Sequence, residues 1–266
     1  MQRAADGLLS SGMHGRYTSK RSLLAIPSSC SERKLVLTAA GYRTLSLDGG
    51  WWGGGKSGKV RRNASGWLTV NDTKFPSSGV GGNIAGLLPL SRYVTARGFL
   101  FGMYTSADAV MCSKDVGGSG GNEEKDAALF ASWNISLMKL DDCGSPSTAA
   151  QGVMEKWHGL YAKLMPDRKV MLINSQVGCC VGGSGGCNAK TFGASLPEWC
   201  YETCTTMYQP ADGDDMWDVI IERHNSVKGR GYLARPGSWL DPGYLMVDVS
   251  THAIRQLHAM RCIDRF

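Results

Sequence analysis

The stretch ISLMKLDD, residues 135–142, decides the fold prediction, because a short apolar run ends here in two carboxylates. Apolar runs of this length are typical of buried strands in a parallel sheet. The segments on either side, EEKDAALFASW (123–133) and TAAQGVMEKWHGLYAKLM (148–165), have the longer amphipathic pattern of helices. A strand between two helices predicts a parallel sheet that is covered by helices.

The same alternation extends along the chain in both directions. Polar residues stand at the carboxyl ends of several expected strands, among them Asp48, Tyr104 and Asp141. In a (β/α)8 barrel these ends converge on one face, whereas an open doubly wound sheet concentrates its site at one switch point. The distribution favours the barrel, with the open sheet as the alternative. The remaining expected strands are residues 42–48, 99–104, 169–174 and 243–249, and the remaining expected helices are residues 84–98 and 214–229.

Composition limits the classes of protein that fit this chain. It has 266 residues, of which 42% are hydrophobic, so it can form one large domain or two small ones. The net charge of +6 comes from scattered basic residues, which argues against a nucleic-acid surface. No stretch approaches the roughly 18–20 apolar residues of a membrane span. The first residues, MQRAADGLLSSGMHG, lack the apolar run of a signal peptide, so no export signal is expected in the sequence as given.

The cysteines indicate an oxidising compartment. The chain has 9 cysteines, and a group of them lies within residues 179–204. Their spacing does not repeat a Cys-x-x-Cys pair and no histidine lies in this window, so disulfides are favoured over a zinc site. Glycosylation sequons at Asn63, Asn71 and Asn134 fit the same compartment.

One motif suggests a nucleotide site. Residues 50–57, GWWGGGKS, follow an expected strand and match the phosphate-loop pattern G-x-x-x-x-G-K-[ST]. Such a loop binds phosphates through its backbone N–H groups and the amino end of the helix after it. The residues that follow, GKVRRNASGW, contain glycines and no apolar stripe, so no such helix is expected. Nucleotide binding through Lys56 is therefore the less favoured alternative.

Two carboxylates form the second candidate site. Asp141 ends an apolar strand with Lys139 two positions earlier on the same strand face, and Asp212 lies in a loop, PADGDDMW, before a helix. Hydrolysis of a glycoside with retention needs two carboxyl groups about 5 Å apart, one to attack carbon and one to protonate the leaving oxygen. Spacing alone leaves open whether these residues are catalytic, cap a helix or only end a strand.

Three tryptophans near the first expected strand, Trp51, Trp52 and Trp67, are a further candidate feature. Aromatic rings of this kind stack on sugars in binding sites, and they also fill hydrophobic cores. The sequence leaves open which role each ring has.

Several segments resemble, in the same order, the motifs of glycoside hydrolase family 27, the α-galactosidases and α-N-acetylgalactosaminidases. NEEKDAALFASWNISLMKLDDC (122–143) resembles the family's YE-x-x-DA-x-x-FA-x-WGVDYLKYDNC. ARGFLFGMYTSADAVMC (96–112) is similar to SKGLKLGIYSDAG-x-x-TC, with Tyr104 and Cys112 at the same mutual spacing. The other resembling segments are AGYRTLSLDGGWW (40–52), RNASGWLTVNDTKFPSSG (62–79), ADGDDMW (211–217) and PGSWLDPGYLMV (236–247).

The resemblance implies a (β/α)8 barrel and a retaining hydrolase for terminal α-galactosidic or related α-glycosidic bonds. Its substrate would be an oligosaccharide or glycoconjugate, and no metal or other cofactor is implied. The nucleophile falls on Asp141 and the general acid/base on Asp212, and a disulfide is implied between Cys112 and Cys143. The implied location is secreted or a lysosome- or vacuole-like compartment. The implied substrate-binding residues are Asp48, Tyr104, Lys139, Gln176 and Tyr208.

Departures from the family pattern bear on activity. The second carboxylate of a family pair is Gly49 here, and Tyr208 replaces an arginine of the acid/base loop. Gly243 replaces the second aspartate of the WNDPD motif. Each lost hydrogen bond costs about 1–3 kcal/mol. A sugar-binding homologue with impaired turnover is therefore the main alternative to an active enzyme.

The extent of the resemblance predicts three segments. Residues 40–250 form the barrel, residues 1–39 hold a remnant of its first helix and an insertion, and residues 251–266 form a divergent tail. The first and eighth strands of the family barrel are not evident in the sequence. We therefore expect an incomplete barrel and a sequence that is truncated at both ends.

Overall fold

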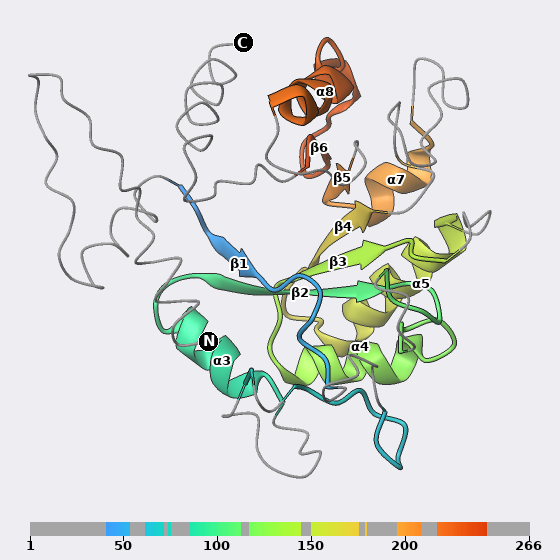
Figure 1. Ribbon diagram of the computed structural model, residues 1–266. Helices are drawn as coiled ribbons and strands as arrows, with labels where there is room; N and C mark the ends of the chain where they lie inside the picture. The colour runs from blue at the N-terminus through green and yellow to red at the C-terminus, as the bar shows by residue number, and fades with distance from the viewer. Residues whose placement is uncertain are drawn as a thin grey trace, which may run out of the picture.

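The structure, a computed structural model, describes residues 41–53, 62–71, 74–75, 86–112, 117–144, 150–175, 179, 196–208 and 217–243. Its centre is a sheet of 6 parallel strands that neighbour one another in chain order (Figure 1). The strands are β1 (Thr44–Ser46), β2 (Leu100–Ser106), β3 (Leu137–Asp141), β4 (Met171–Ser175), β5 (Thr206–Tyr208) and β6 (Trp239–Asp241).

The sheet has the connectivity of a (β/α) barrel and confirms the predicted fold class. Every strand pairs in parallel with the next one along the chain. An open doubly wound sheet would instead reverse its strand order at a switch point. Within the described residues β1 and β6 each pair on one side only, so the barrel is incomplete there, as the sequence predicted.

Helices connect and cover the strands. In Figure 1, α3 and α4 lie below the strands β1 to β3. Among the described residues no helix has the length and apolarity needed to cross a membrane. The helices are α3 (Leu88–Thr95), α4 (Glu123–Ser132), α5 (Ala150–Leu164), α7 (Glu198–Thr203) and α8 (Trp217–Val227), with the short 3-10 helix η3 at Gly231–Leu233.

Local sequence explains where α3 and α4 begin and end. Pro89 stands in the first turn of α3, where its missing N–H costs no intrahelical hydrogen bond. Gly98, with φ +80°, follows the helix and turns the chain toward β2. Three acidic residues in the first turn of α4 complement the positive end of the helix dipole.

An aromatic cluster fills the space between the sheet and its helices. The ring of Trp51 makes edge contacts with Phe130 and Trp133, at centroid distances of 5.8 and 5.6 Å. Phe130 also stacks on Trp157 from α5 at 6.4 Å. All four rings are almost completely buried. Each such pair adds about 0.5–1.5 kcal/mol beyond the area that it buries, so the cluster ties the segment after β1 to α4 and α5.

A buried ion pair attaches the segment 62–70 to α4. Both carboxylate oxygens of Asp126 accept hydrogen bonds from the Arg62 guanidinium, at 2.7 and 2.8 Å. Arg62 also donates to the backbone carbonyls of Gly66 and Gly118, each at 3.0 Å. The Asp126 side chain is fully buried, and removing its charge from water costs free energy. The two charge-assisted hydrogen bonds from Arg62 offset that cost.

Two strands and one helix were missed by the sequence reasoning. β5 and β6 have three residues each, too few for a recognisable apolar run, and α7 has six. The expected strand at 243–249 lies outside the described residues except for Gly243, and the strand observed near it, β6, ends before that residue. The expected segments 1–39 and 251–266 also lie outside the described residues.

Candidate active site

Polar side chains gather at the carboxyl ends of the strands, as a barrel site requires. The strand register pairs Tyr104 with Lys139 and Ser106 with Asp141, and at the other end of the sheet it pairs Tyr208 with Asp241. Parallel pairing keeps these ends level, so residues that are far apart in sequence lie at one edge of the sheet.

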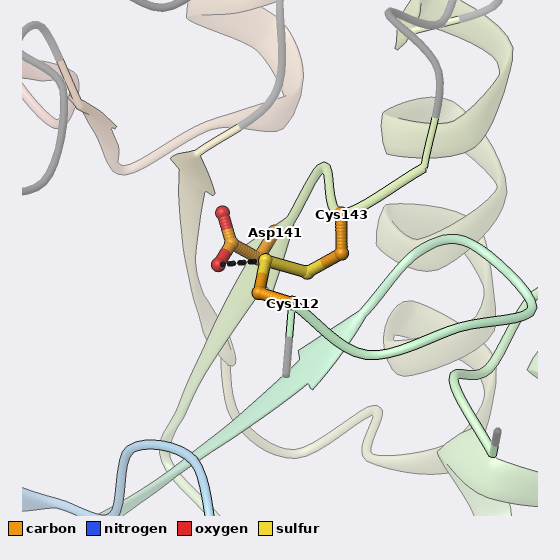
Figure 2. Close-up of side chains that lie close together, drawn as sticks. All are labelled: Cys112, Asp141 and Cys143. Atoms are coloured by element: carbon orange, nitrogen blue, oxygen red, sulfur yellow. Dashed lines mark hydrogen bonds between the residues drawn. A yellow bond between two sulfur atoms is a disulfide. The ribbon is translucent and has the colours of Figure 1, made fainter. Parts of the chain in front are cut away.

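Asp141 is held by contacts from β2 and from its own loop. The Tyr104 hydroxyl donates a hydrogen bond of 2.9 Å to Asp141 Oδ2. The backbone N–H of Asp142 lies 3.2 Å from Oδ1. The Sγ of Cys112 lies 3.2 Å from Oδ2, and Figure 2 shows this sulfur beside the carboxylate. These contacts limit the orientations that the carboxylate can take.

Cys112 and Cys143 form a disulfide, with an S–S distance of 1.95 Å and a Cα–Cα distance of 4.4 Å, which confirms this predicted pair. Ligand-type atoms of Cys112, Asp141 and Cys143 all lie within 4.8 Å of one another. Metal ions bind thiolates, whereas these sulfur atoms are bonded to each other. The disulfide therefore serves as a wall beside Asp141 and leaves only the carboxylate as a possible metal ligand in this group.

Lys139 sits among a carboxylate and two aromatic rings. Its Nζ lies 3.1 Å from Asp48 Oδ2. The same atom lies 5.3 Å from the centre of the Tyr104 ring and 5.5 Å from that of Tyr208. The Lys139 side chain is 12% exposed while that of Asp48 is 66% exposed, so the pair opens toward solvent on the Asp48 side. Asp48, Tyr104, Lys139 and Tyr208, four of the expected substrate-binding residues, thus lie close together.

Asp241 is a site residue that the sequence reasoning missed. It ends β6, and its Oδ1 accepts a hydrogen bond of 2.8 Å from the Gly243 N–H. Burial raises the pKa of Asp241, while this hydrogen bond and the charge of Lys139 lower it. The signal that could have identified it is WLDPG (239–243), the segment that resembles the WNDPD motif and contains Asp241.

Asp108 is a second missed residue. Its Oδ2 accepts hydrogen bonds from the backbone N–H groups of Cys143 and Gly144, at 2.8 and 2.7 Å. The loop that follows Asp141 is therefore fixed by a carboxylate from the loop after β2. No pattern in the sequence signals this contact, because it joins residues 35 and 36 positions apart.

The three candidate tryptophans have different surroundings. Trp51 lies in the core, and its Nε1 donates a hydrogen bond of 2.9 Å to the Tyr104 carbonyl. Trp52 stacks on the Tyr104 ring at 6.4 Å with an interplanar angle of 28°, so it adjoins the site. Trp67 lies next to Lys125 of α4, whose Nζ is 5.7 Å from its ring centre.

A second cysteine cluster lies between β4 and α7. Cys179 and Cys200 form a disulfide with a Cα–Cα distance of 5.7 Å. Cys204 remains a buried thiol whose Sγ is 4.0 Å from that of Cys179, and burial raises the pKa of this thiol. Asn174 of β4 donates toward Cys179 at 3.2 Å. The Cys179–Cys200 disulfide fits the predicted oxidising compartment, and it favours disulfides over a zinc site for these two cysteines.

Some predicted residues lie outside the described part of the chain. These are the expected acid/base Asp212, the expected substrate ligand Gln176, and Lys56 and Ser57 of the phosphate-loop pattern. Within the described part of the phosphate-loop pattern, Trp51 and Trp52 are both buried.

The chain is similar in sequence to known proteins. A family model described as alpha galactosidase A matches residues 34–260. The chain is 30% identical to Alpha-galactosidase 2 of Arabidopsis thaliana over 215 residues, which cover 79% of this chain and 46% of the relative. It thus spans less than half the length of that relative.

Solved structures share the fold. A putative alpha-galactosidase/melibiase from Bacteroides fragilis matches with a TM-score of 0.62 and 25% identity, over 82% of this chain and 42% of that one. A glycoside hydrolase family 27 β-L-arabinopyranosidase from Geobacillus stearothermophilus, in complex with arabinose, matches with a TM-score of 0.58 and 16% identity, over 79% of this chain and 55% of that one.

Proposed function

The chain belongs to the alpha galactosidase A family, within glycoside hydrolase family 27, and on that premise we propose that it is a retaining glycosidase for terminal α-galactosidic or related α-glycosidic bonds. The observation that carries the proposal is the placement of Asp141. This carboxylate ends β3 at the edge of the sheet where barrel sites lie, and it accepts the Tyr104 hydrogen bond there.

The proposed mechanism is double displacement. Asp141 attacks the anomeric carbon while the protonated Asp212 donates its proton to the leaving oxygen, which forms a covalent glycosyl-enzyme. Asp212 then takes a proton from water, and that water releases the sugar from Asp141 with the original configuration. Tyr104 orients the nucleophile in both steps through its hydrogen bond of 2.9 Å.

The substrate-binding roles follow from charge and position. The Lys139 ammonium lies next to Asp48 at 3.1 Å, so the two side chains offer a paired donor and acceptor to sugar hydroxyls. Tyr104 and Tyr208 provide aromatic surface on either side of that ammonium. Gln176 completes the proposed set. An oligosaccharide or glycoconjugate with a terminal sugar is the expected substrate.

The two disulfides support an oxidising compartment for this activity. Cys112–Cys143 and Cys179–Cys200 persist in oxidising surroundings and are rare in a reducing cytosol. We place the protein outside the cell or in a lysosome- or vacuole-like compartment.

Chemical rescue tests the assignment of the two carboxylates. Hydrolysis of an aryl α-galactoside is measured for the native chain, for Asp141→Gly and for Asp212→Gly, with and without azide. We expect each variant to lose roughly 10³-fold or more in kcat. Azide should restore turnover to both, yielding the β-glycosyl azide with Asp141→Gly and the α-glycosyl azide with Asp212→Gly.

A control and two outcomes complete the test. Asp167→Asn changes an exposed carboxyl on the loop before β4, and it should leave the rate unchanged. If the native chain binds the glycoside and does not hydrolyse it, the impaired sugar-binding homologue replaces our proposal. If Asp141→Gly keeps its activity, the assignment of the nucleophile is wrong.

A further inference from the structure

Trp52 fills the space above Gly49 at the edge of the candidate site. A Cβ atom at Gly49 would lie 3.2 Å from Cη2 and 3.8 Å from Cζ3 of the Trp52 ring, and 3.9 Å from Cε1 of Tyr104. A side chain at position 49 therefore requires the indole to shift. The atoms of Trp52 that face Gly49 are carbons of the benzene part of the ring, which neither donate nor accept hydrogen bonds.

The position of the indole is set by its neighbours. Trp52 is 8% exposed. It makes an edge contact with Trp51 at 5.9 Å and stacks on Tyr104 at 6.4 Å. Because Trp51 is held in the core by its hydrogen bond to the Tyr104 carbonyl, the indole of Trp52 cannot swing away without disturbing packed rings.

The apolar surface of Trp52 lies next to the residues that hold Asp141 and next to the Asp48–Lys139 pair. The Tyr104 ring that Trp52 covers carries the hydroxyl that binds Asp141. Gly49 directly follows Asp48, the partner of Lys139. A sugar ring that reaches Asp141 while it hydrogen-bonds to Asp48 and Lys139 must therefore lie against the surface formed by Gly49 and Trp52.

We propose that Trp52 determines specificity, and that the preferred substrate is a galactose-like pyranoside with a hydrogen or methyl group in place of the hydroxyl that would face Gly49. The substrate class is thus a deoxy-hexoside or a pentopyranoside. The inference rests on the proposed glycosidase function. A hydroxyl pressed against ring carbons loses its water partner and gains none, whereas a C–H or methyl group packs against the indole without that loss.

A panel of aryl glycosides tests the proposal. It contains the α-D-galactoside, its 4-deoxy analogue, the α-D-fucoside, which lacks the 6-hydroxyl, and the β-L-arabinopyranoside, which lacks the whole hydroxymethyl group. We expect the native chain to favour one of the three hydroxyl-deficient members over the galactoside by about 10- to 100-fold in kcat/KM, the range that an apolar wall provides.

Variants assign the preference to Trp52. Trp52→Ala should bring the ratio of kcat/KM values toward unity, and the double variant Gly49→Asp with Trp52→Ala should reverse it in favour of the galactoside. Trp67→Ala is the matched control, because it removes an indole that lies beside Lys125 of α4. An equal shift in Trp52→Ala and Trp67→Ala, or a native chain that favours the galactoside, would overturn the inference.

Binding separates this inference from the proposed function. Affinities of the methyl glycosides of the same panel are measured by saturation-transfer NMR on the native chain and on Trp52→Ala. If nothing is hydrolysed but the hydroxyl-deficient sugars bind more tightly in a Trp52-dependent way, the proposed function fails and the inference stands. If the panel is hydrolysed with a preference for the galactoside, the proposed function stands and the inference fails. A chain that binds no panel member contradicts both the proposed function and the inference.

Discussion

The hydroxyl of Tyr104 donates a hydrogen bond of 2.9 Å to Oδ2 of Asp141, and so joins the wall of the site to its proposed nucleophile. The two residues belong to neighbouring strands and are 37 positions apart. The ring of Tyr104 also contacts Trp52 and lies beside the Lys139 ammonium. One side chain thus connects the nucleophile, the cation and the apolar surface of the site.

Removing that hydroxyl should reduce catalysis more than binding. Tyr104→Phe keeps the ring that packs against Trp52 and Lys139, and it deletes the hydrogen bond to a charged group. Such bonds contribute about 1.5–3 kcal/mol, so we expect kcat on an aryl glycoside to fall by roughly 10- to 100-fold while KM changes little. Tyr232→Phe, which changes a tyrosine that is 66% exposed, is the control. Equal activity of both variants would show that the bond does not orient Asp141.

The disulfide beside Asp141 should stabilise the fold. Cys112 and Cys143 are 31 residues apart, and closing a loop of this size contributes about 3–4 kcal/mol on the chain-entropy model. The double variant Cys112→Ser, Cys143→Ser should lower the free energy of unfolding by that amount in urea titrations. A native chain treated with reductant should lose at least as much, because reductant also breaks the Cys179–Cys200 disulfide. No change in the urea midpoint of the double variant would contradict this prediction.

Glycine is required at position 144 because of Asp108. A Cβ at Gly144 would lie 2.8 Å from Cγ of Asp108, whose carboxylate binds the N–H groups of this loop. Gly144→Ala should therefore destabilise the protein by about 1–3 kcal/mol and lower activity by displacing the loop after Asp141. Gly152→Ala is the matched control, since nothing lies within 4 Å of its added Cβ in α5. That variant should gain about 0.5–1 kcal/mol from helix propensity, and thermal unfolding compares the two.

Asp126 predicts a defined pH dependence of stability. Burial raises the pKa of Asp126 above its ordinary value of 3.8, although the hydrogen bonds and charge of Arg62 oppose this shift. The folded protein therefore holds this proton more tightly than the unfolded chain does. The contribution to stability is complete below the unfolded pKa of about 3.9 and is lost as pH rises through the folded pKa.

A comparison with Asp126→Asn isolates this effect. The amide keeps an oxygen for Arg62 but does not titrate. We expect the free energy of unfolding of the native chain, relative to this variant, to decrease in urea titrations as pH rises above the unfolded pKa of about 3.9. A relative increase over the same range would mean that the charge of Arg62 outweighs burial, so that the pKa of Asp126 is lowered.

Local patterns predicted the central elements well. The apolar runs at 99–104, 135–141 and 169–174 correspond to β2, β3 and β4, and the amphipathic segments at 123–133 and 148–165 correspond to α4 and α5. These elements are long enough for periodicity to be read within the element itself. β5 and β6 have three residues each, so their strand pairing depends on neighbours rather than on their own sequence.

The sequence by itself determined the fold class and the family motifs. It also indicated Asp48, Tyr104, Lys139 and Asp141 as candidates, because each stands at the end of a recognisable strand or within a motif. Only the tertiary structure decided that Asp108 holds the loop after Asp141, that Asp241 lies beside the other polar residues at this edge of the sheet, and that Trp52 rather than Trp67 packs beside Gly49. The Lys139–Asp48 pair alone spans 91 positions. Contacts of this kind arise from the register of parallel strands and the packing of their loops, and no local pattern in a single sequence records them.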